Sequence, residues 1–460
     1  MKKVLLLNPP GKKYYMRDYY CSKISKAVYY YHPIDFIVLS GILSKYFEIY
    51  VMDCIAERMN QEMALKEILH ISPDIIIFLS GTVSMETDFP FLAKVKLKTS
   101  ALMIGIGDIF LDYAKELLRN NYFIDAVLLD FTTNDIVAFL NDKNSAYQNI
   151  IYKERNQIIE RKEVHSSGVF SISRPRHELF KNNKYNFPFS GRETFATVIT
   201  DFGCPFSCSY CVVNRFGYKE RKVEDVIEEL SFINMIGIKE IVFKDQTFAA
   251  NTLRAKLLCE EIFSNKIEIS WTCFSRAELI EENLLAIMKK AGCHTIIFGI
   301  ESSNRAVLSR FDRYSALEKI KETFSLCRGM GIETVGTFII GLPGDNRQSI
   351  ERTIVFSKEI GCDFASFNIF TPAHGTKIRN TLIKESVIEN KLFFMDSGIS
   401  YPSVETGLLK RSQIWRLRKK AIVSFYIRPM YAIEKIKQCH SFFEIRNMLK
   451  QAFGILRSLN

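Results

Sequence analysis

The chain has 460 residues, enough for two or three domains, and 47% of them are hydrophobic while 25% are charged. This balance excludes an intrinsically disordered chain, and no apolar run approaches the length of a membrane-spanning helix. The formal net charge is +11, and eleven cysteines occur without an export signal, so we expect a cytoplasmic protein with reduced cysteines.

The first 140 residues alternate short apolar runs with segments of helical periodicity. The expected strands are 3–7, 48–52, 74–79, 101–105 and 126–129, and the expected helices are 35–45, 61–70, 89–98, 112–118 and 134–140. Continuous apolar runs are typical of buried parallel strands, which helical crossovers connect. The pattern predicts an α/β domain over residues 1–140 with a doubly wound, flavodoxin-like sheet.

Small and polar residues follow three of these strands. They are Asn8 in NPPG, Ser80 and Thr82 in SGTVS, and Gly105 and Gly107 in GIGD. Ligands bind beyond the carboxyl ends of the strands in such a sheet, and small residues let the backbone approach a large flat ligand. An ordinary glycine-containing turn is the alternative. GIGD lacks the third glycine of a dinucleotide fingerprint and follows the fourth strand, which argues against nicotinamide binding.

Residues 141–193 differ from the preceding domain in composition. Polar residues open the stretch at Asn141 and Asp142, and the runs HSSG and SRPRH follow. We expect an ordered linker here, with one small hairpin from Asn149 to Glu163.

The alternation of strands and helices resumes at residue 194 with a longer repeat. The expected strands are 194–200, 240–244, 268–274, 295–300, 333–340 and 364–370, and the expected helices are 223–236, 253–263, 281–290, 316–330 and 349–360. Six strands separated by helices predict a partial (β/α)6 barrel over residues 194–405. In that architecture the chemistry takes place on the loops that follow the strands.

Three cysteines lie on the loop after the first barrel strand, in the run TDFGCPFSCSYCVVNR. Cys204, Cys208 and Cys211 have the spacing C-x3-C-x2-C. Most structural zinc sites and iron–sulfur clusters have four protein ligands, so three local thiolates favour a 4Fe-4S cluster with one iron open to a small molecule. A zinc site completed by a distant residue such as Cys273 or Cys293 is the alternative.

The CPFSCSYC loop resembles the radical S-adenosylmethionine (SAM) enzymes, and the later loops resemble them in order. These loops are FKDQTF at Phe243, WTCFSRAE at Trp271, GIES at Gly299, GTFIIGLPGD at Gly336 and FTPAHGT at Phe370. With the LNPP start and the SFYIRP run at 424–429, nearly the whole chain resembles the cobalamin-binding branch of the superfamily. That branch includes the anaerobic magnesium-protoporphyrin ester cyclase and hopanoid methylase types.

The resemblance implies that Cys204, Cys208 and Cys211 hold the cluster and that SAM binds to its open iron. It also implies SAM contacts from the barrel loops, at Tyr210, Asp245, Gln246, Arg276, Glu301 and Gly341. Tyr210 would border the adenine, Glu301 would accept from the ribose hydroxyls, and Arg276 would pair with the methionyl carboxylate. Asp245 and Gln246 would contact the methionyl amine, and Gly341 would shape the loop beneath the adenosine. Loop packing and salt bridges at strand ends are the alternatives.

For the N-terminal domain the resemblance implies a bound cobalamin. Its contacts would come from the residues at the strand ends, Asn8, Ser80, Thr82, Gly105 and Gly107. The D-x-H-x-x-G motif that offers a histidine to cobalt is absent from residues 1–140. The lower face of the cobalt would therefore be vacant, bound by water, or covered by a side chain from SGTVS.

The last segment, 406–460, is expected to be a helical extension of basic character. Residues 410–460 contain twelve Lys or Arg and two Glu, which gives +10 of the net +11. A helix is expected over 413–426, with one apolar side that could cover the barrel. A solvated basic face and contact with an anionic membrane surface are both open interpretations. No RNA-binding module is visible, so we expect no nucleic acid partner.

The leading hypothesis is an enzyme that makes a 5′-deoxyadenosyl radical and methylates an unactivated substrate carbon from methylcobalamin. A rival hypothesis uses the radical for cyclisation or rearrangement without methyl transfer. A third, methylthiolation of tRNA, needs a second cluster in a domain that has only Cys21 and Cys54. A non-catalytic cobalamin or cluster sensor is the alternative of another class. We expect an electron donor such as flavodoxin or ferredoxin, and a small or lipid-like substrate near a tyrosine-rich segment over 14–31.

Overall fold

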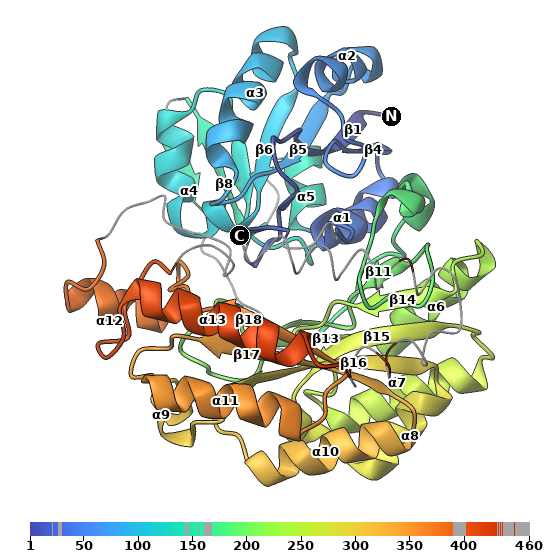
Figure 1. Ribbon diagram of the computed structural model, residues 1–460. Coiled ribbons are helices and arrows are strands. Elements are labelled where there is room, and N and C mark those ends of the chain that lie inside the picture. Colours follow the sequence, from blue (N-terminus) through green and yellow to red (C-terminus); the bar gives the residue numbers. More distant parts are fainter. Residues whose placement is uncertain are drawn as a thin grey trace.

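Figure 1 shows the computed structural model of the chain, with an N-terminal α/β domain lying against a larger α/β barrel. The structure describes all residues except 21, 26–29, 143–146, 156, 161–167, 390–401, 430, 432, 434, 436–445 and 447–460. Within the described part, no helix is long and apolar enough to cross a membrane.

The N-terminal sheet is built on the five parallel strands that the sequence predicted. In spatial order these are β4 (Glu48–Asp53), β1 (Lys3–Asn8), β5 (Ile75–Leu79), β6 (Leu102–Ile106) and β7 (Ala126–Leu128). The helices are α1 (Ile34–Ser44), α2 (Gln61–Ile71), α3 (Met85–Lys98), α4 (Asp108–Asn120) and α5 (Asp135–Asn141). Order and helices confirm the doubly wound, flavodoxin-like prediction.

The N-terminal sheet continues beyond residue 140, where the sequence placed the end of the domain. β8 (Ile150–Glu154) pairs antiparallel with β7, and β9 (Gln157–Glu160) pairs antiparallel with β8. The predicted hairpin is therefore present, but it belongs to the sheet and lengthens it to seven strands. Strand β8 begins with the buried residues Ile150, Ile151 and Tyr152, and the sequence carried no sign of which strand the hairpin would join.

The barrel contains the six parallel strands that the sequence predicted, in sequential order. They are β11 (Ala196–Val198), β14 (Glu240–Phe243), β15 (Ser270–Ser275), β16 (Cys293–Glu301), β17 (Glu333–Ile340) and β18 (Phe364–Ile369). The connecting helices are α6 (Val223–Met235), α7 (Thr252–Ser264), α8 (Glu282–Lys290), α9 (Arg305–Ser309), α10 (Leu317–Gly329) and α11 (Arg347–Glu359). The open series confirms a partial (β/α)6 barrel, with a core between the sheet and its helices.

Helix α13 (Arg411–Tyr426) packs against β18 and α11 and covers the open edge of the barrel sheet (Figure 1). The apolar side of this helix joins the core of the barrel through Ile414, Leu417, Ala421, Ile422 and Phe425. Basic side chains of the segment bind to the barrel as well: Lys420 pairs with Glu351, and Lys435 pairs with Glu333 and Asp363. The basic extension is therefore attached to the catalytic body.

The two domains turn the carboxyl ends of their strands toward each other. The segment between β1 and α1 includes β2 (Tyr15–Met16) and β3 (Lys23–Ile24), and it lies at this boundary. We call one group of packed rings the aromatic junction; its members are Tyr19, Tyr20, Phe131, Phe202 and Phe216. Lys219 of the barrel also pairs with Asp130 of the N-terminal domain at 2.7 Å. These contacts hold the two carboxyl edges together.

Candidate active site

The cysteine loop is held at its base by a short antiparallel ladder that the sequence did not predict. β12 (Asp201–Gly203) pairs with β13 (Tyr218–Arg221), and the N–H of Cys204 donates to the carbonyl of Gly217 at 3.0 Å. Gly203 has φ +84°, and a Cβ there would lie 2.0 Å from the Gly217 carbonyl oxygen. Only glycine fits this position, because both the left-handed backbone and the close approach exclude a side chain.

The tip of the cysteine loop is attached to two later barrel segments. The N–H of Ser209 donates to the carbonyl of Phe311 at 2.9 Å, and the N–H of Ile378 donates to the carbonyl of Ser209 at 3.1 Å. Phe311 follows α9, and Ile378 begins α12 (Lys377–Lys384). The Tyr210 ring packs edge-on against Phe311 at 6.1 Å. Hydrogen bonds therefore hold the cysteine loop both at its base and at its tip.

The three thiols lie near one another on this loop. Burial raises the pKa of each, and that of Cys211 reaches about 12 with smaller contributions from the charges of Cys204 and Cys208. Among the described residues, no group of three or more His, Cys, Asp or Glu is arranged around a single metal ion. A 4Fe-4S cluster binds each thiolate at a different iron, so its ligands need not converge on one point. The donor set therefore fits a cluster better than a single ion.

The structure does not support the zinc alternative. Cys273 and Cys293 lie in the core between the barrel sheet and its helices, whereas Cys204 and Cys211 pack against a different core. The thiols of Cys273 and Cys293 interact with each other, with fully buried side chains. Neither is placed to complete a site on the cysteine loop.

Three of the predicted SAM contacts come together beside the cysteine loop. The Arg276 guanidinium lies 3.9 Å from the centre of the Phe206 ring, within the loop itself. Burial raises the pKa of Glu301 to about 7, against the opposing effects of Arg276 and the Tyr210 hydroxyl nearby. Tyr210, Arg276 and Glu301 thus face a common region next to Cys208, as their predicted roles require.

Glu301 has a strained backbone at the carboxyl end of β16. Its φ is +66°, and the pairing of β16 with β17 shifts register between Gly299 and Glu301. A bulge of this kind redirects a side chain, and strained backbone of this kind occurs at functional sites as well as in turns. A Cβ on Gly299 would meet the Glu301 carboxylate at 2.9 Å, so the neighbouring glycine makes room for it.

Asp245 forms hydrogen bonds with the residues that precede the cysteine loop. Its carboxylate accepts hydrogen bonds from the N–H and hydroxyl of Thr200, at 2.6 and 2.7 Å, and from the N–H of Asp201 at 3.2 Å. These bonds hold the strand that leads into the cysteine loop and occupy both oxygens. The contact of Asp245 with the SAM amine remains a prediction, as does that of its partly exposed neighbour Gln246.

Gly341 has φ +85°, and a Cβ there would lie 2.7 Å from the Ile414 side chain of α13. This glycine therefore lets α13 approach the loop after β17, and its place beneath the adenosine remains a prediction. Sequence reasoning missed Thr247, whose hydroxyl lies 3.5 Å from the Cys204 sulfur. The only feature of the sequence that could have identified Thr247 is its position two residues after Asp245, at the end of the same strand.

The predicted cobalamin contacts are gathered at the carboxyl edge of the N-terminal sheet, but the chain itself satisfies them. Asn8 bonds to Tyr30, Asp53 and Arg17, and Ser80 donates to Asp88. Thr82 donates to Asp108. The two glycines lie close to other parts of the chain: a Cβ on Gly105 would meet the Phe110 ring at 2.5 Å, and a Cβ on Gly107 would lie 2.0 Å from the Ser80 carbonyl oxygen.

The segment after β1 provides several of these internal partners. Arg17 and Asp88 form a fully buried ion pair, and Ser22 donates to Asp108 through its N–H at 2.8 Å. The side chains of Asn8, Ser80 and Thr82 are therefore hydrogen-bonded within the chain. The contact of the five residues with a corrin remains a prediction.

His374, in the loop after β18, is buried beside the N-terminal domain. Its Nδ1 lies 3.1 Å from the Tyr113 hydroxyl of α4. Burial lowers the pKa of His374 to about 4, with the charge of Arg379 acting in the same direction. The imidazole is therefore neutral and joins the two domains at the rim of the barrel.

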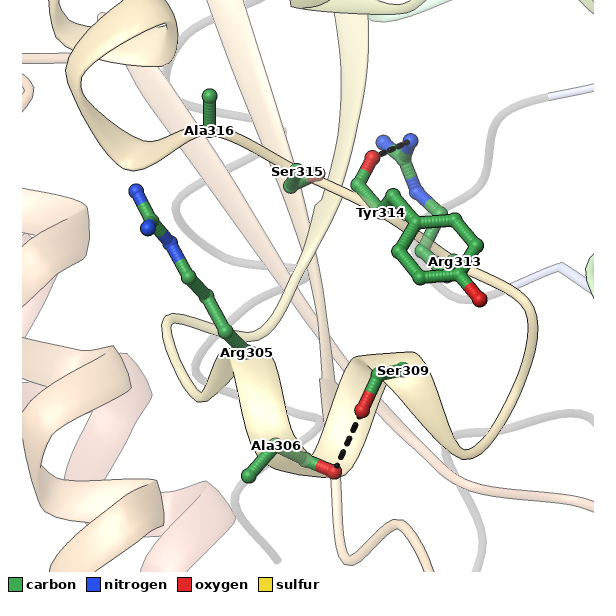
Figure 2. Close-up of a pocket in the computed structure, with 7 residues that line it drawn as sticks. All are labelled: Arg305, Ala306, Ser309, Arg313, Tyr314, Ser315 and Ala316. Atoms are coloured by element: carbon green, nitrogen blue, oxygen red, sulfur yellow. Dashed lines mark hydrogen bonds between the residues drawn. The ribbon is translucent and has the colours of Figure 1, made fainter.

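Figure 2 shows a surface hollow of about 480 Å³ at the rim of the barrel, around α9 and the start of α10. It is lined by Arg305, Ala306, Ser309, Arg313, Tyr314, Ser315 and Ala316. Arg313 bonds with Glu278 at 3.2 Å, and Glu278 is 3.8 Å from Arg276. The lining contains neither the cysteines nor the predicted SAM contacts, so the hollow lies outside the candidate site.

Residues 198–356 match the family model of the radical SAM superfamily. An uncharacterized methyltransferase of Pyrococcus horikoshii is 30% identical over 442 residues, which cover 92% of this chain and 93% of the relative. The radical SAM methyltransferase TsrM of Kitasatospora setae, solved with cobalamin and a [4Fe-4S] cluster bound, aligns with 18% identity and a TM-score of 0.65 over 84% of this chain and 75% of TsrM. The cobalamin-dependent SAM radical enzyme OxsB with aqua-cobalamin aligns with 15% identity and a TM-score of 0.68 over 100% of this chain and 72% of OxsB.

Proposed function

This chain belongs to the radical SAM superfamily, and from that premise we propose that it is a cobalamin-dependent methyltransferase acting on an unactivated carbon. The observation that carries the proposal is the convergence of Tyr210, Arg276 and Glu301 on the three-cysteine loop. The methyltransferase relative, which matches over nearly the full length of both chains, supports the reaction class. The likeness to TsrM and OxsB supports the pairing of a barrel with a cobalamin domain.

Cys204, Cys208 and Cys211 would hold the cluster, and the remaining residues would position SAM. A bound cluster supplies the electron that cleaves a carbon–sulfur bond of SAM. Arg276 presents a planar fork of N–H donors suited to the methionyl carboxylate. Glu301 presents a carboxylate that would accept from the ribose hydroxyls, and desolvation of this carboxylate raises its pKa. Fixed donors and acceptors of this kind supply the orientation that the reaction needs.

The boundary between the domains would keep water away from a reactive radical. The aromatic junction closes one side of it, and Tyr20 accepts a hydrogen bond from the N–H of Gly203 at 3.2 Å, directly beside the cysteine loop. On another side His374 contacts Tyr113. Packed rings and a buried imidazole on these sides separate the site from solvent, which is what a reactive intermediate needs.

Cobalamin enters the proposal through the relatives and the flavodoxin-like sheet, and not through the five residues named from the sequence. Those residues bond within the chain, so no step is assigned to them. We further propose a cytoplasmic enzyme that receives electrons from a low-potential protein such as flavodoxin or ferredoxin. The nine cysteines in the described part of the chain are all free thiols, in keeping with a reducing compartment.

The test is anaerobic reconstitution with iron, sulfide and hydroxocobalamin, followed by reduction and incubation with methyl-labelled SAM and a small-molecule extract. Cluster and corrin absorption should both persist after gel filtration, 5′-deoxyadenosine should form, and label should appear in a product other than SAM. Deoxyadenosine without label transfer would favour cyclisation or rearrangement. Protein that binds the cofactors but never cleaves SAM would favour a sensor.

A further inference from the structure

We propose that the boundary between the two domains contains a binding site for a primary ammonium group of the substrate, with Asp35 as its recognition residue. The inference rests on the proposed function, because it assigns that enzyme's unknown substrate to the chemical class of amines. It is carried by one carboxyl group without a partner and by the charges that surround it.

Asp35 lies in the first turn of α1, with no exposed surface. Neither oxygen of its carboxyl group has a hydrogen-bond partner among the described residues. A buried carboxyl group without partners is strongly unfavourable, and buried polar groups in proteins are nearly always hydrogen-bonded. Such an exception is expected where a ligand supplies the missing donors.

Other buried carboxylates of the same domain show what is usual there. Asp53 accepts hydrogen bonds from the hydroxyls of Tyr30 and Tyr185 and from the N–H groups of Ile55 and Ala56. The Asp88 carboxylate, likewise buried, forms an ion pair with Arg17. Asp53 and Asp88 thus have hydrogen-bond or ion-pair partners within the chain, and Asp35 differs from them in this respect.

Among the described residues no cation forms an ion pair with Asp35, because the nearest cations lie against Asp18. Lys244 is buried at the end of β14, and its Nζ lies 3.4 Å from the Asp18 carboxylate. The Tyr31 hydroxyl also donates to Asp18 at 3.3 Å, and Lys23 is a further cation near that carboxylate. Asp18 thus has its own partners. A cationic ligand group would match the charge of Asp35, and an ammonium has three donors for its two oxygens.

The position of Asp35 is where a ligand of both domains would bind. The first turn of α1 lies at the carboxyl edge of the N-terminal sheet, and α1 packs against β11 of the barrel (Figure 1). Lys244 immediately precedes Asp245, which holds the cysteine loop. Burial, and then the charge of Asp18, raise the pKa of Asp35 well above its usual value, against smaller opposing effects of Lys244 and of the backbone N–H groups of Asp35 and Tyr19.

The first arm of the test compares two probes that share a ring and differ in charge, phenethylamine and 3-phenylpropionate. Calorimetry on the reconstituted protein should show binding of phenethylamine and none of 3-phenylpropionate. The substitution Asp35→Asn should weaken phenethylamine binding at least tenfold. Equal binding by wild type and variant, binding of the acid alone, or no binding of the amine would overturn the inference. Weakened binding of aquocobalamin alone would point to a corrin carboxamide and overturn the ammonium assignment.

The second arm separates a ligand site from an overlooked structural bond. Asp35→Asn should leave the melting temperature unchanged or raise it, because no native hydrogen bond is lost. Asp53→Asn is the matched control and should lower it, since Asp53 has several partners. An equal fall in both variants would show that Asp35 has a structural partner in solution, and would overturn the proposal.

Neither arm depends on turnover. Binding can therefore fail in a protein that cleaves SAM, which would refute the ammonium site alone. Conversely, a wild-type protein that binds the amine but never cleaves SAM would refute the proposed function alone.

Discussion

The two carboxyl edges that face each other differ in how their polar groups are used. At the edge of the N-terminal sheet, Asn8, Ser80 and Thr82 are bonded to partners from the segment after β1 and from neighbouring loops. At the edge of the barrel, Arg276 and Glu301 remain partly exposed, and Glu301 has a strained backbone. The comparison teaches that two edges with the same topology can differ in how far contacts within the chain use their polar side chains.

The largest effect is expected from breaking the barrel edge at Gly203→Ala. The Cβ would collide with the Gly217 carbonyl in a left-handed conformation, costing roughly 2 to 5 kcal/mol. Iron incorporation at the cysteine loop should then be lost, as measured by iron and sulfide analysis after reconstitution. Gly237→Ala is the control, because Gly237 has φ +86° but open space around it. Normal iron content in Gly203→Ala would contradict the account of the loop.

The N-terminal edge is tested by Arg17→Ala. Removing the guanidinium leaves Asp88 buried without its charged partner, which should lower the free energy of unfolding by roughly 3 to 5 kcal/mol. Denaturant titration would measure it. Lys115→Ala, which breaks the exposed pair with Glu160, should cost about 1 kcal/mol or less. Similar losses in the two variants would mean that the N-terminal edge is not closed by this pair.

The substitution Asp108→Asn should change how the stability of the protein depends on pH, which tests the N-terminal edge. Burial raises the pKa of Asp108 to about 6 in the folded protein, above its usual 3.8. The folded state therefore keeps a proton that the unfolded chain has lost, and wild-type stability falls as the pH rises from about 4 to 6. This contribution is roughly 3 kcal/mol and should be missing from the variant. Parallel stability curves for the two proteins over that range would contradict the closed network around Asp108.

The smallest effect is expected at the barrel edge, from Glu301→Gln. An amide keeps the shape but loses the charged acceptor for the ribose hydroxyls, so SAM affinity should fall roughly tenfold or somewhat more. Equilibrium dialysis with the reconstituted protein measures this directly. Glu282→Gln, at an exposed site on α8, should bind SAM like the wild type. Unchanged affinity in Glu301→Gln would remove Glu301 from the SAM site.

Much of the fold could be predicted because its strands are continuous apolar runs. The strand expected at 333–340 coincides with β17, and the cysteine loop follows β11 as expected. The ladder of β12 and β13 was not predicted, because its strands are short and carry charged residues. Five-residue α9 also lacks enough periodicity to detect.

The functional residues also fall into two groups, those that the sequence could predict and those that it could not. Arg276 and Glu301 could be found because each ends a barrel strand, where topology alone brings them together. The bonding of Arg17 with Asp88 joins residues 71 positions apart, and the close approach of Gly341 to Ile414 joins the loop after β17 to helix α13. Such pairs leave no local pattern in the sequence. This is why the N-terminal edge was predicted to be available although its polar groups are used within the chain.

The most direct test of the central claim is the formation of 5′-deoxyadenosine by the anaerobically reconstituted and reduced protein, with Cys208→Ala as the control. A cluster held by all three cysteines should cleave SAM at a measurable rate in the wild type and not in the variant. Deoxyadenosine from neither protein, or equally from both, would contradict the assignment of the cysteine loop as the catalytic centre.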